Sequence, residues 1–320
     1  LKINVIGAGP GGLYLSLLMK LADPRHEITV YERNRADDTF GFGVVFSDET
    51  LGNFMGQDEE TYRQIRDAFA YWDEIEVRYR GDRVRSGGHG FAGMSRQKLL
   101  DILQGRCRDV GVEMRFEHDI TDVSQYRDAD LMLGSDGVNS LVRETYKDSF
   151  NPTIDMRLTK FVWLGTTQKF DAFTFIFKPN EHGWFYNHAY QYGQGAGKAA
   201  STWILETHED TWENAGLDQA SEEETLAYFE ELFMDELDGH KLLSNKSIWR
   251  NFPVVSNESW HHENVVLIGD AAHTAQFSIG SGTKIAMEGA IALAESLGEE
   301  NSVDQAILAY EDKRQMEIAR

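Results

Sequence analysis

A glycine-rich turn near the N-terminus places the strongest constraint on how this chain can fold. A short β-branched run over residues 2–6 leads into Gly7, Gly9 and Gly12, which follow the pattern Gly-x-Gly-x-x-Gly, and an apolar helical stretch begins directly afterwards. Glycines at these positions permit a tight turn, a close approach of backbone amides to a pyrophosphate, and close packing of the helix on the strand. Since residues 28–32 predict a second strand, we interpret the segment as a dinucleotide-binding βαβ unit.

An acidic residue ends the second strand of this unit. Glu32 stands where a carboxylate can bond both ribose hydroxyls of an adenosine and would repel a 2′-phosphate, and Arg33 follows it. The ordered succession of strand, glycines, helix, strand and acid favours a nucleotide site over a chance glycine-rich turn. This unit alone does not distinguish NAD from FAD.

The composition of the chain disfavours several classes of protein. Its 320 residues carry 53 acidic and 31 basic side chains, a net charge of −22, so its surface on average repels nucleic acid and anionic membranes. No run approaches the roughly 18 apolar residues of a membrane span. Cys107 is the single cysteine, and no spacing of His, Asp or Glu predicts a metal site. We expect a cytoplasmic protein of about two domains, with no nucleic-acid or membrane partner.

Hydrophobic periodicity divides the chain into two kinds of structure. Residues 173–177, 184–192 and 202–206 alternate in the two-residue rhythm of antiparallel strands. Residues 265–268 instead form a buried type of strand that runs through a glycine-rich turn into a helix at residues 283–297. We therefore predict a discontinuous α/β domain that is interrupted by a β-rich domain.

Two distant motifs extend the nucleotide site. Asp136-Gly137 follows a strand-like run and precedes Ser140 and Arg143, and Asp270 lies in the motif Gly-Asp-Ala-Ala-His. Together with the glycine turn, this combination resembles the single-component FAD-dependent aromatic hydroxylases. The resemblance implies FAD as the cofactor, with the carboxylate of Asp270 near its ribityl chain, and NADH or NADPH as a transient reductant. In the alternative interpretation, Asp270 merely caps the following helix.

The same resemblance implies a fold and a set of cofactor contacts. The fold is α/β, with a Rossmann-like FAD-binding domain (p-hydroxybenzoate-hydroxylase-like) of residues 1–72, 94–155 and 261–320. An antiparallel β-sheet substrate domain of residues 73–93 and 156–260 interrupts it. Arg96 would open a helix beside the flavin, although an exposed arginine in a first helical turn is the alternative. The expected cofactor-binding residues are Gly7, Gly9, Pro10, Gly12, Glu32, Arg33, Arg96, Asp136, Asp270, Gly280, Gly282 and Thr283.

A closer resemblance lies outside the flavin motifs. Residues 37–51, 87–91, 161–167, 188–192 and 247–253 are similar to the group of salicylyl-CoA 5-hydroxylase and 2-aminobenzoyl-CoA monooxygenase. This similarity implies an FAD- and NAD(P)H-dependent monooxygenase that hydroxylates an aromatic acyl-CoA, with O2 added to the flavin as a C4a-hydroperoxide. Such a protein must exclude water and hold the aromatic ring within reach of the oxygen.

Aromatic residues on two strands supply a candidate substrate pocket. Period-two spacing places Tyr186, His188 and Tyr190 on one face of a strand, and Phe175 belongs to the strand expected beside it. Phe175 and Tyr186 are candidate substrate-binding residues. A proton acceptor near the ring would make a phenol or aniline more nucleophilic, so His89, His188 and Tyr190 are candidate catalytic residues. The alternative for each of them is an ordinary structural role in a sheet core.

The densest basic segment spans residues 76–85 and predicts a hairpin. Arg78, Arg80, Arg83 and Arg85 outnumber two acids there. Arg78, Arg80 and Arg83 are therefore candidates for binding the phosphates of a CoA thioester. A solvated hairpin edge that is protected by its charge is the alternative.

Two further functions stay open at this stage. The same chemistry could act on a free indole or phenolic compound, in which case CoA and the arginine hairpin would not matter. Alternatively, the chain could bind flavin without hydroxylating anything. The sequence does not indicate the exact aromatic substrate, the choice between NADH and NADPH, or the oligomeric state.

Overall fold

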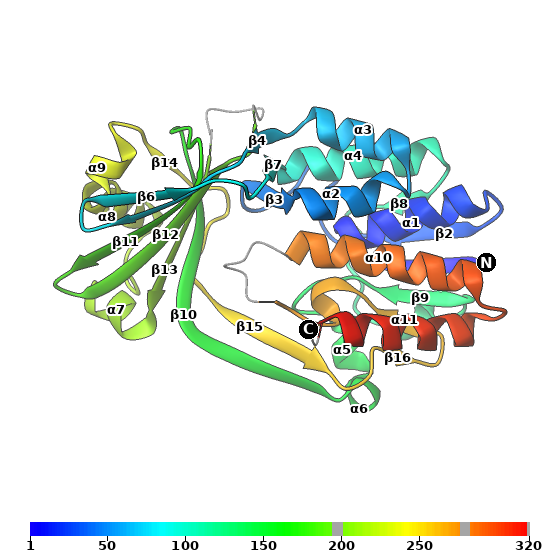
Figure 1. The fold of residues 1–320 in the computed structure, drawn as a ribbon. Helices are drawn as coiled ribbons and strands as arrows, with labels where there is room; N and C mark the ends of the chain where they lie inside the picture. Colours follow the sequence, from blue (N-terminus) through cyan, green and yellow to red (C-terminus); the bar gives the residue numbers. More distant parts are fainter. Residues whose placement is uncertain (194–200, 276–281, 319–320) are drawn as a thin grey trace.

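The computed structural model describes residues 1–193, 201–275 and 282–318 and arranges them as an α/β part and a β-rich part (Figure 1). A six-stranded sheet lies at the centre of the α/β part, in the order β16-β17-β9-β1-β2-β8, and every neighbouring pair is parallel except β16 with β17. The glycine turn follows β1, and the two later motifs follow β9 and β17, so all three lie along one edge of the sheet. The strands are β1 (Lys2–Ile6), β2 (Glu27–Tyr31), β8 (Glu113–Arg115), β9 (Leu131–Gly134), β16 (His261–His262) and β17 (Val265–Leu267).

Helices pack against one another around this sheet. α1 begins at Pro10, directly after the glycine turn, where the fixed φ of proline suits the first helical position. It contacts both α4 and α10, and α10 contacts α11 in turn. Gly11 lets α1 approach α10 closely, because a Cβ there would lie 3.0 Å from the carbonyl oxygen of Ala286. The helices are α1 (Pro10–Ala22), α2 (Asp48–Met55), α3 (Glu59–Asp67), α4 (Arg96–Asp109), α5 (Leu141–Thr145), α6 (Lys147–Phe150), α10 (Gly282–Glu299) and α11 (Val303–Ile318), with 3₁₀ turns at Val123–Tyr126 and Gly269–Ala271.

The β-rich part is built on an eight-stranded sheet in the order β14-β10-β13-β12-β11-β5-β6, with β15 paired to β10. The prediction of antiparallel pairing is correct for every pair except β11 with β5, which run parallel. β5 enters from the α/β part and not through a hairpin, so no tight turn forces the two strands to run in opposite directions. The strands are β5 (Ile75–Tyr79), β6 (Asp82–Ser86), β10 (Pro152–Thr166), β11 (Phe173–Asn180), β12 (Gly183–Gln191), β13 (Ser201–His208), β14 (Leu242–Leu243) and β15 (Arg250–Asn257).

A three-stranded sheet that the sequence analysis did not predict joins the two parts. It consists of β3 (Gly43–Ser47), β7 (Phe91–Ser95) and β4 (Ala70–Trp72), in the order β3-β7-β4. The Gly43 amide donates a hydrogen bond to the Thr202 hydroxyl at 3.0 Å, and its carbonyl accepts one from the Tyr190 hydroxyl at 2.9 Å. Trp72 of this sheet packs with Phe173 of the large sheet, so the interface is hydrophobic as well as hydrogen-bonded.

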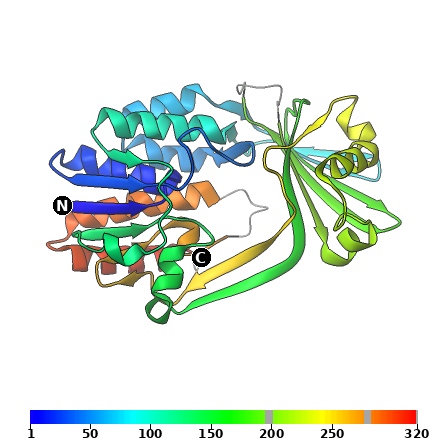
Figure 2. The ribbon, with the colours of Figure 1, turned by 180° about the vertical axis from the view of Figure 1, so that it is seen from behind.

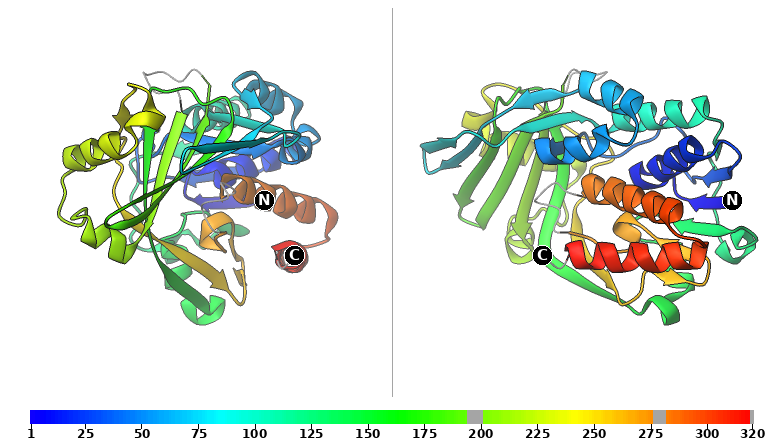
Figure 3. Two further views of the ribbon diagram at one scale, coloured as in Figure 1. Left: turned by 60° about the vertical axis from the view of Figure 1, so that its left-hand side comes forward. Right: turned by 45° about the vertical axis from the view of Figure 1, so that its right-hand side comes forward.

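The two faces of the large sheet have different surroundings. One face carries Phe185, Trp203 and Leu205, which are fully buried with side chains of α7 (Glu209–Asn214), α8 (Glu222–Leu232) and α9 (Met234–Leu237) (Figure 3). The other face carries the predicted aromatic row and is turned toward the α/β part, as the view from behind also shows (Figure 2).

The predicted α/β class agrees with this arrangement. The domain boundaries proposed from the sequence stay a prediction, because β10 runs from the α/β part into the large sheet without a break. Within the ranges that the structure describes, no helix is long and apolar enough to cross a membrane.

Candidate functional site

The glycine turn combines tight packing with open space. Gly7 has φ +104°, and a Cβ there would lie 2.5 Å from the carbonyl oxygen of Ser135. A Cβ on Gly12 would collide with the Gly7 carbonyl and the Ser135 hydroxyl. Gly9 has much more room, since its nearest neighbour would be 4.0 Å from such a Cβ. Packing therefore requires Gly7 and Gly12, whereas Gly9 leaves space for a ligand in front of Pro10 and α1.

Glu32 is anchored to the same turn. Its carboxylate accepts hydrogen bonds from the Ala8 amide at 3.0 Å and from the backbone and side-chain amides of Asn34 at 2.9 and 2.6 Å. These contacts fix the carboxylate just beyond β2, where ribose recognition was expected. Arg33 is exposed beside it.

Arg96 connects segments that are far apart in the sequence. It opens α4, donates a hydrogen bond to the Thr39 hydroxyl and lies over the Phe40 ring, with Cζ 4.3 Å from the ring centroid. Burial lowers the pKa of Arg96 to about 10, whereas the carboxylates of Asp270 and Glu32 act in the opposite direction. The charges of both carboxylates that the sequence analysis assigned to the two halves of FAD therefore act on one guanidinium.

Asp270 follows β17 and lies beside the start of α10. A Cβ on Gly282 would be 3.8 Å from Oδ1 of Asp270, and Thr283 follows in the first turn of the helix. Burial raises the pKa of Asp270, while nearby guanidinium groups lower it. The start of a helix favours negative charge, so this corner of the site suits an anionic part of a ligand. Gly280 lies outside the described residues.

Asp136 supports the site through the protein and not through an open carboxylate. Its oxygens accept hydrogen bonds from the Ser140 hydroxyl at 2.5 Å and from the first two amides of α5 at 2.7 and 3.2 Å. Arg143 from α5 then donates to the Ala271 carbonyl at 3.1 Å, which ties this motif to the one that contains Asp270. The cofactor contact expected from Asp136 stays a prediction. In the structure its carboxylate accepts hydrogen bonds from backbone amides at the N-terminus of α5.

These residues fit an extended FAD. Open space at Gly9, the carboxylate of Glu32 and the carboxylate of Asp270 follow β1, β2 and β17 of the six-stranded sheet, and Arg96, which follows β7 of the three-stranded sheet, experiences the charge of both carboxylates. A dinucleotide has a ribose for the first carboxylate, phosphates for the guanidinium and the glycine turn, and ribityl hydroxyls for the second carboxylate.

Cross-strand pairing assembles the predicted aromatic face. β11 and β12 place Phe175 opposite His188 and Phe177 opposite Tyr186. Phe173 and Phe175 stack with their centroids 4.8 Å apart. Burial decreases along the face, from Phe173, which is 6% exposed, to Tyr186, which is 40% exposed. The face is thus dry beside the α/β part and open to solvent at its outer end.

Glu206 belongs to this face, and the sequence analysis missed it. β13 places it opposite Tyr186, and its Oε1 lies 3.4 Å from Nδ1 of His188. His188 is buried, so the two form a polar pair within aromatic surroundings. The alternation of β13 assigns Glu206 to one face of its own strand, but no sequence signal gives the register of β13 against β12.

The other two catalytic candidates have different surroundings. His89 is exposed, with Nε2 3.0 Å from the Ser86 hydroxyl, and its ring stacks on Phe91. Tyr190 is buried, its hydroxyl donates to the Gly43 carbonyl, and burial raises its pKa. Tyr190 therefore positions the joining sheet, and a catalytic role for either residue stays a prediction.

The arginine hairpin forms as predicted, but part of its charge is neutralised internally. Glu76 is almost fully buried and binds Arg78, and its Oε2 lies 2.5 Å from Nε of Arg85. Glu76 and Arg78 point to the sheet face opposite the aromatic row. Arg80 and Arg83 are exposed, and neither has an ion pair within the described ranges. Arg83 stands opposite Arg78 and so belongs to the same face, whereas Arg80 lies over the ring of Tyr79, whose strand position is on the aromatic face. The predicted phosphate contact is therefore best placed for Arg80.

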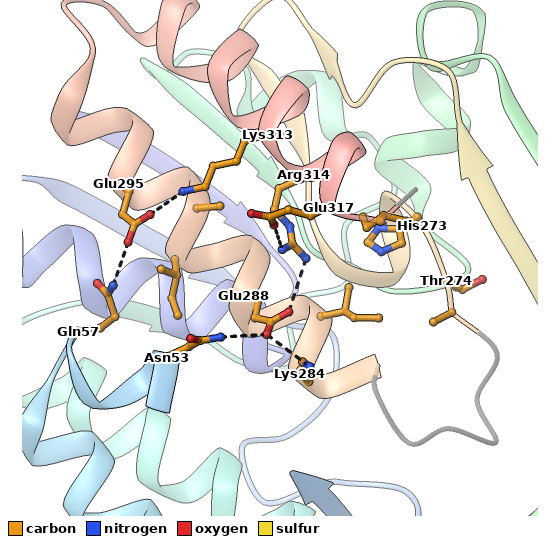
Figure 4. A pocket seen from close by; sticks show the side chains of 15 residues that line it. Asn53, Gln57, His273, Thr274, Lys284, Glu288, Glu295, Lys313, Arg314 and Glu317 are labelled. Carbon is orange, nitrogen blue, oxygen red and sulfur yellow. Dashed lines mark hydrogen bonds and ion pairs between the residues drawn. The ribbon is translucent and has the colours of Figure 1, made fainter. Parts of the chain in front are cut away.

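A separate cavity of about 810 Å³ lies beside α2, α10 and α11 (Figure 4). Two glutamates of α10, Glu288 and Glu295, each accept a hydrogen bond from a side-chain amide on the α2 side and form an ion pair with a basic side chain of α11. The polar lining of the cavity therefore connects three helices. His273 also lines the cavity, and its ring stacks on Trp260. In the described part of the chain, no group of three His, Cys, Asp or Glu residues could hold a metal. The bracing contacts are Asn53–Glu288 at 3.4 Å, Gln57–Glu295 at 3.1 Å, Arg314–Glu288 at 3.9 Å and Lys313–Glu295 at 2.9 Å.

Comparison with known proteins agrees with this site. The family model described as "FAD binding domain" matches residues 1–320. The chain is 46% identical over 329 aligned residues to salicyloyl-CoA 5-hydroxylase of a Streptomyces species, which covers all of this chain and 63% of that protein. It is 32% identical to 3-hydroxy-4-methyl-anthranilyl-(aryl-carrier protein) 5-monooxygenase of Streptosporangium sibiricum, over 98% of this chain and 84% of that protein.

A solved structure shows the same fold. 2-Methyl-3-hydroxypyridine-5-carboxylic acid oxygenase superimposes with a TM-score of 0.79 at 18% sequence identity, over 98% of this chain and 87% of that chain. The predicted α/β class and the predicted family resemblance are therefore confirmed.

Proposed function

Because the chain belongs to the FAD binding domain family and has FAD as its cofactor, we propose that it is a monooxygenase that hydroxylates an aromatic acyl thioester. The observation that carries this proposal is the 46% identity to salicyloyl-CoA 5-hydroxylase along the entire chain. In this proposal NADH or NADPH supplies the electrons and O2 supplies the oxygen atom. The chain spans 63% of that relative, so the proposal concerns the reaction of this part.

The cofactor, when bound, supplies the reduction of O2 and the transfer of one oxygen atom to the substrate. The residues of the chain hold it in place. In this proposal the glycine turn and Arg96 bind the phosphates, Glu32 binds the adenosine ribose, and Asp270 binds the ribityl hydroxyls. The glycine turn, Glu32 and Asp270 follow β1, β2 and β17 of one sheet, and the charges of Glu32 and Asp270 both act on Arg96, which supports the assignment.

The substrate ring would lie against the buried end of the aromatic face. Phe173 and Phe175 exclude water there, which protects a reactive oxygen species from unproductive decay. His188 would accept the proton of a ring hydroxyl or amino group and so make the ring more electron-rich. The thioester arm would leave past the half-exposed Tyr186, toward Arg80, which lies over the Tyr79 ring at the turn of the hairpin.

Two sources of the acyl thioester fit this arrangement. The relative from Streptosporangium sibiricum is named for a substrate on an aryl-carrier protein, and the relative from Streptomyces for a CoA ester. Both present a thioester on a long arm that ends in a phosphate. A free indole or phenol stays as the alternative substrate, and flavin binding without hydroxylation is the alternative function.

Anaerobic stopped-flow reduction of the FAD-loaded protein tests the proposal. NADH and NADPH are each mixed with the protein in the presence of salicyloyl-CoA, 2-aminobenzoyl-CoA, free salicylate or no ligand. We expect the CoA esters to accelerate flavin reduction at least about tenfold and to yield a hydroxylated product in air. Equally slow flavin reduction under all four ligand conditions, with either nucleotide, would count against a thioester substrate. Acceleration by free salicylate alone would favour a free phenol, and no product with any ligand would favour flavin binding without hydroxylation.

Substitutions in the hairpin test the phosphate contact separately. Arg80→Ala should weaken CoA-ester binding about threefold to tenfold while FAD occupancy stays complete, and Arg83→Ala should have a smaller effect because Arg83 shares the far face with Arg78. Arg25→Ala serves as a control, since Arg25 is also exposed but lies on the far side of α1 in the turn before β2. Unchanged affinity in both hairpin variants would remove the hairpin from the site.

A further inference from the structure

The first half of β10 has a neighbouring strand on one side only. On one side, β15 pairs with β10 over residues 152–156 and again at residues 160–161, and on the other side β13 pairs with it from Thr159 onward. On the side away from β15, residues 152–158 therefore have no strand neighbour in the described part of the chain. Two opposite views show this stretch of β10 as the outer border of the ribbon that it forms with β15 (Figures 1 and 2). A row of open backbone donors and acceptors of this kind is a template for another strand.

Apolar and charged side chains alternate along this edge. Ile154, Met156 and Leu158 are 49%, 54% and 60% exposed. Asp155 and Arg157 lie between them and form an exposed ion pair with an N–O distance of 3.0 Å. Alternation in a strand places the three apolar residues on one face and the two charged residues on the other. Three neighbouring apolar side chains exposed together on one strand are typical of an interaction surface.

The order of these residues is self-complementary about Met156. If a second copy of the strand lies antiparallel with the two-fold axis at Met156, Asp155 of each copy stands opposite Arg157 of the other. Ile154 of each copy then stands opposite Leu158 of the other, and the two Met156 side chains meet. Charged side chains on an edge strand usually oppose its association, but here opposite charges stand at equal distances from Met156, so they attract in this symmetric pairing.

We propose that residues 154–158 of β10 pair with the same residues of a second copy of this chain and form a symmetric dimer. The pairing ends at Leu158, because β13 pairs with β10 from Thr159 onward. Arg157 and Leu158 lie where β10 shifts its register against β15, between Met156 and Lys160, but the ion pair of Asp155 with Arg157 places these two side chains on the same face. One face of the pair would bury six apolar side chains, and the other would form two ion pairs between the copies.

Sedimentation velocity of the FAD-loaded protein over a range of concentrations tests the dimer. We expect the unmodified protein to dimerise. Asp155→Arg and Arg157→Asp should each raise the dimer dissociation constant at least about tenfold, because either change places like charges opposite each other twice. A mixture of these two variants should dimerise again, since arginines of one strand then face aspartates of the other. An ion pair within one chain could not produce this rescue.

The control is Arg25→Asp, which changes the net charge as Arg157→Asp does and breaks a similar exposed pair, that of Arg25 with Asp23. It should leave the dissociation constant unchanged. A protein that stays monomeric at all concentrations would overturn the proposal. A dimer that persists in both single variants, or a mixture that stays monomeric when the unmodified protein dimerises, would also overturn it.

Discussion

Substitution of Gly12 by alanine tests whether packing keeps the glycine turn in shape. The new Cβ would collide with the Gly7 carbonyl and the Ser135 hydroxyl and would lie 3.1 Å from Cγ1 of Val5. Because Gly12 is inside α1, alanine gains about 1 kcal/mol of helix propensity. Overpacking against a backbone oxygen costs about 3 kcal/mol, the upper end of its usual range, since a carbonyl cannot rotate away as a side chain can. The free energy of unfolding should therefore fall by about 2 kcal/mol.

Gly105→Ala is the matched control for this prediction. Gly105 lies in α4, and no atom is within 4 Å of a Cβ built there, so alanine should stabilise the protein by about 1 kcal/mol. Urea unfolding should thus separate the two variants by about 3 kcal/mol. Visible flavin absorbance relative to protein should fall in Gly12→Ala, because displacement of the Gly7 carbonyl distorts the turn, and should stay complete in Gly105→Ala. Equal stability of the two variants, or complete FAD occupancy in both, would refute the packing argument.

Three other changes have defined outcomes. Burial lowers the pKa of His273 to about 4, so the unfolded chain binds a proton more tightly than the folded chain does, and the free energy of unfolding falls as the pH drops from about 7 to about 5. In urea unfolding at these two pH values, the free energy of unfolding of His273→Phe should fall by about 2 kcal/mol less than that of the unmodified protein. Glu76→Gln should lower the free energy of unfolding, measured in urea, by about 3 kcal/mol. This is near the lower end of the cost of removing one partner of a buried ion pair, because the Arg85 side chain is about one-third exposed. Arg96→Met should weaken FAD binding at least about tenfold in a fluorescence titration, and the affinity of Arg96→Lys should lie between those of Arg96→Met and the unmodified protein. Unchanged FAD affinity in Arg96→Met would contradict the proposed contact of Arg96 with the phosphates.

The elements that the sequence predicted share a local cause. The strand before Gly7, the helix after it and the strand that ends at Glu32 all follow from periodicity and from glycine placed at a turn, which depend on neighbouring residues alone. The three-stranded sheet was missed because its strands come from three separate segments, and their pairing depends on contacts between residues far apart in the sequence. The parallel pairing of β5 with β11 was missed for the same reason.

The site shows the same division between local pattern and tertiary contact. Counting charges indicated the arginine hairpin, but it did not show that Glu76 would bind two of the arginines on the face away from the aromatic row. The motif around Asp136 was visible, but its carboxylate forms hydrogen bonds within the protein. Glu206 carried no signal, since its place beside His188 depends on the register of two strands.

The sequence by itself determined the glycine turn between β1 and α1, because only glycine permits that backbone and that packing, and it predicted a dinucleotide there. It also determined the family, through motifs that keep their order along the chain. Only the tertiary structure decided which arginines of the hairpin are bound by Glu76 and which aromatic rings are buried. It also brought the charges of Glu32 and Asp270 to act on the same guanidinium, that of Arg96. The physical reason is that burial and electrostatic pairing depend on distances in space, which strand order and register set and which spacing along the chain does not contain.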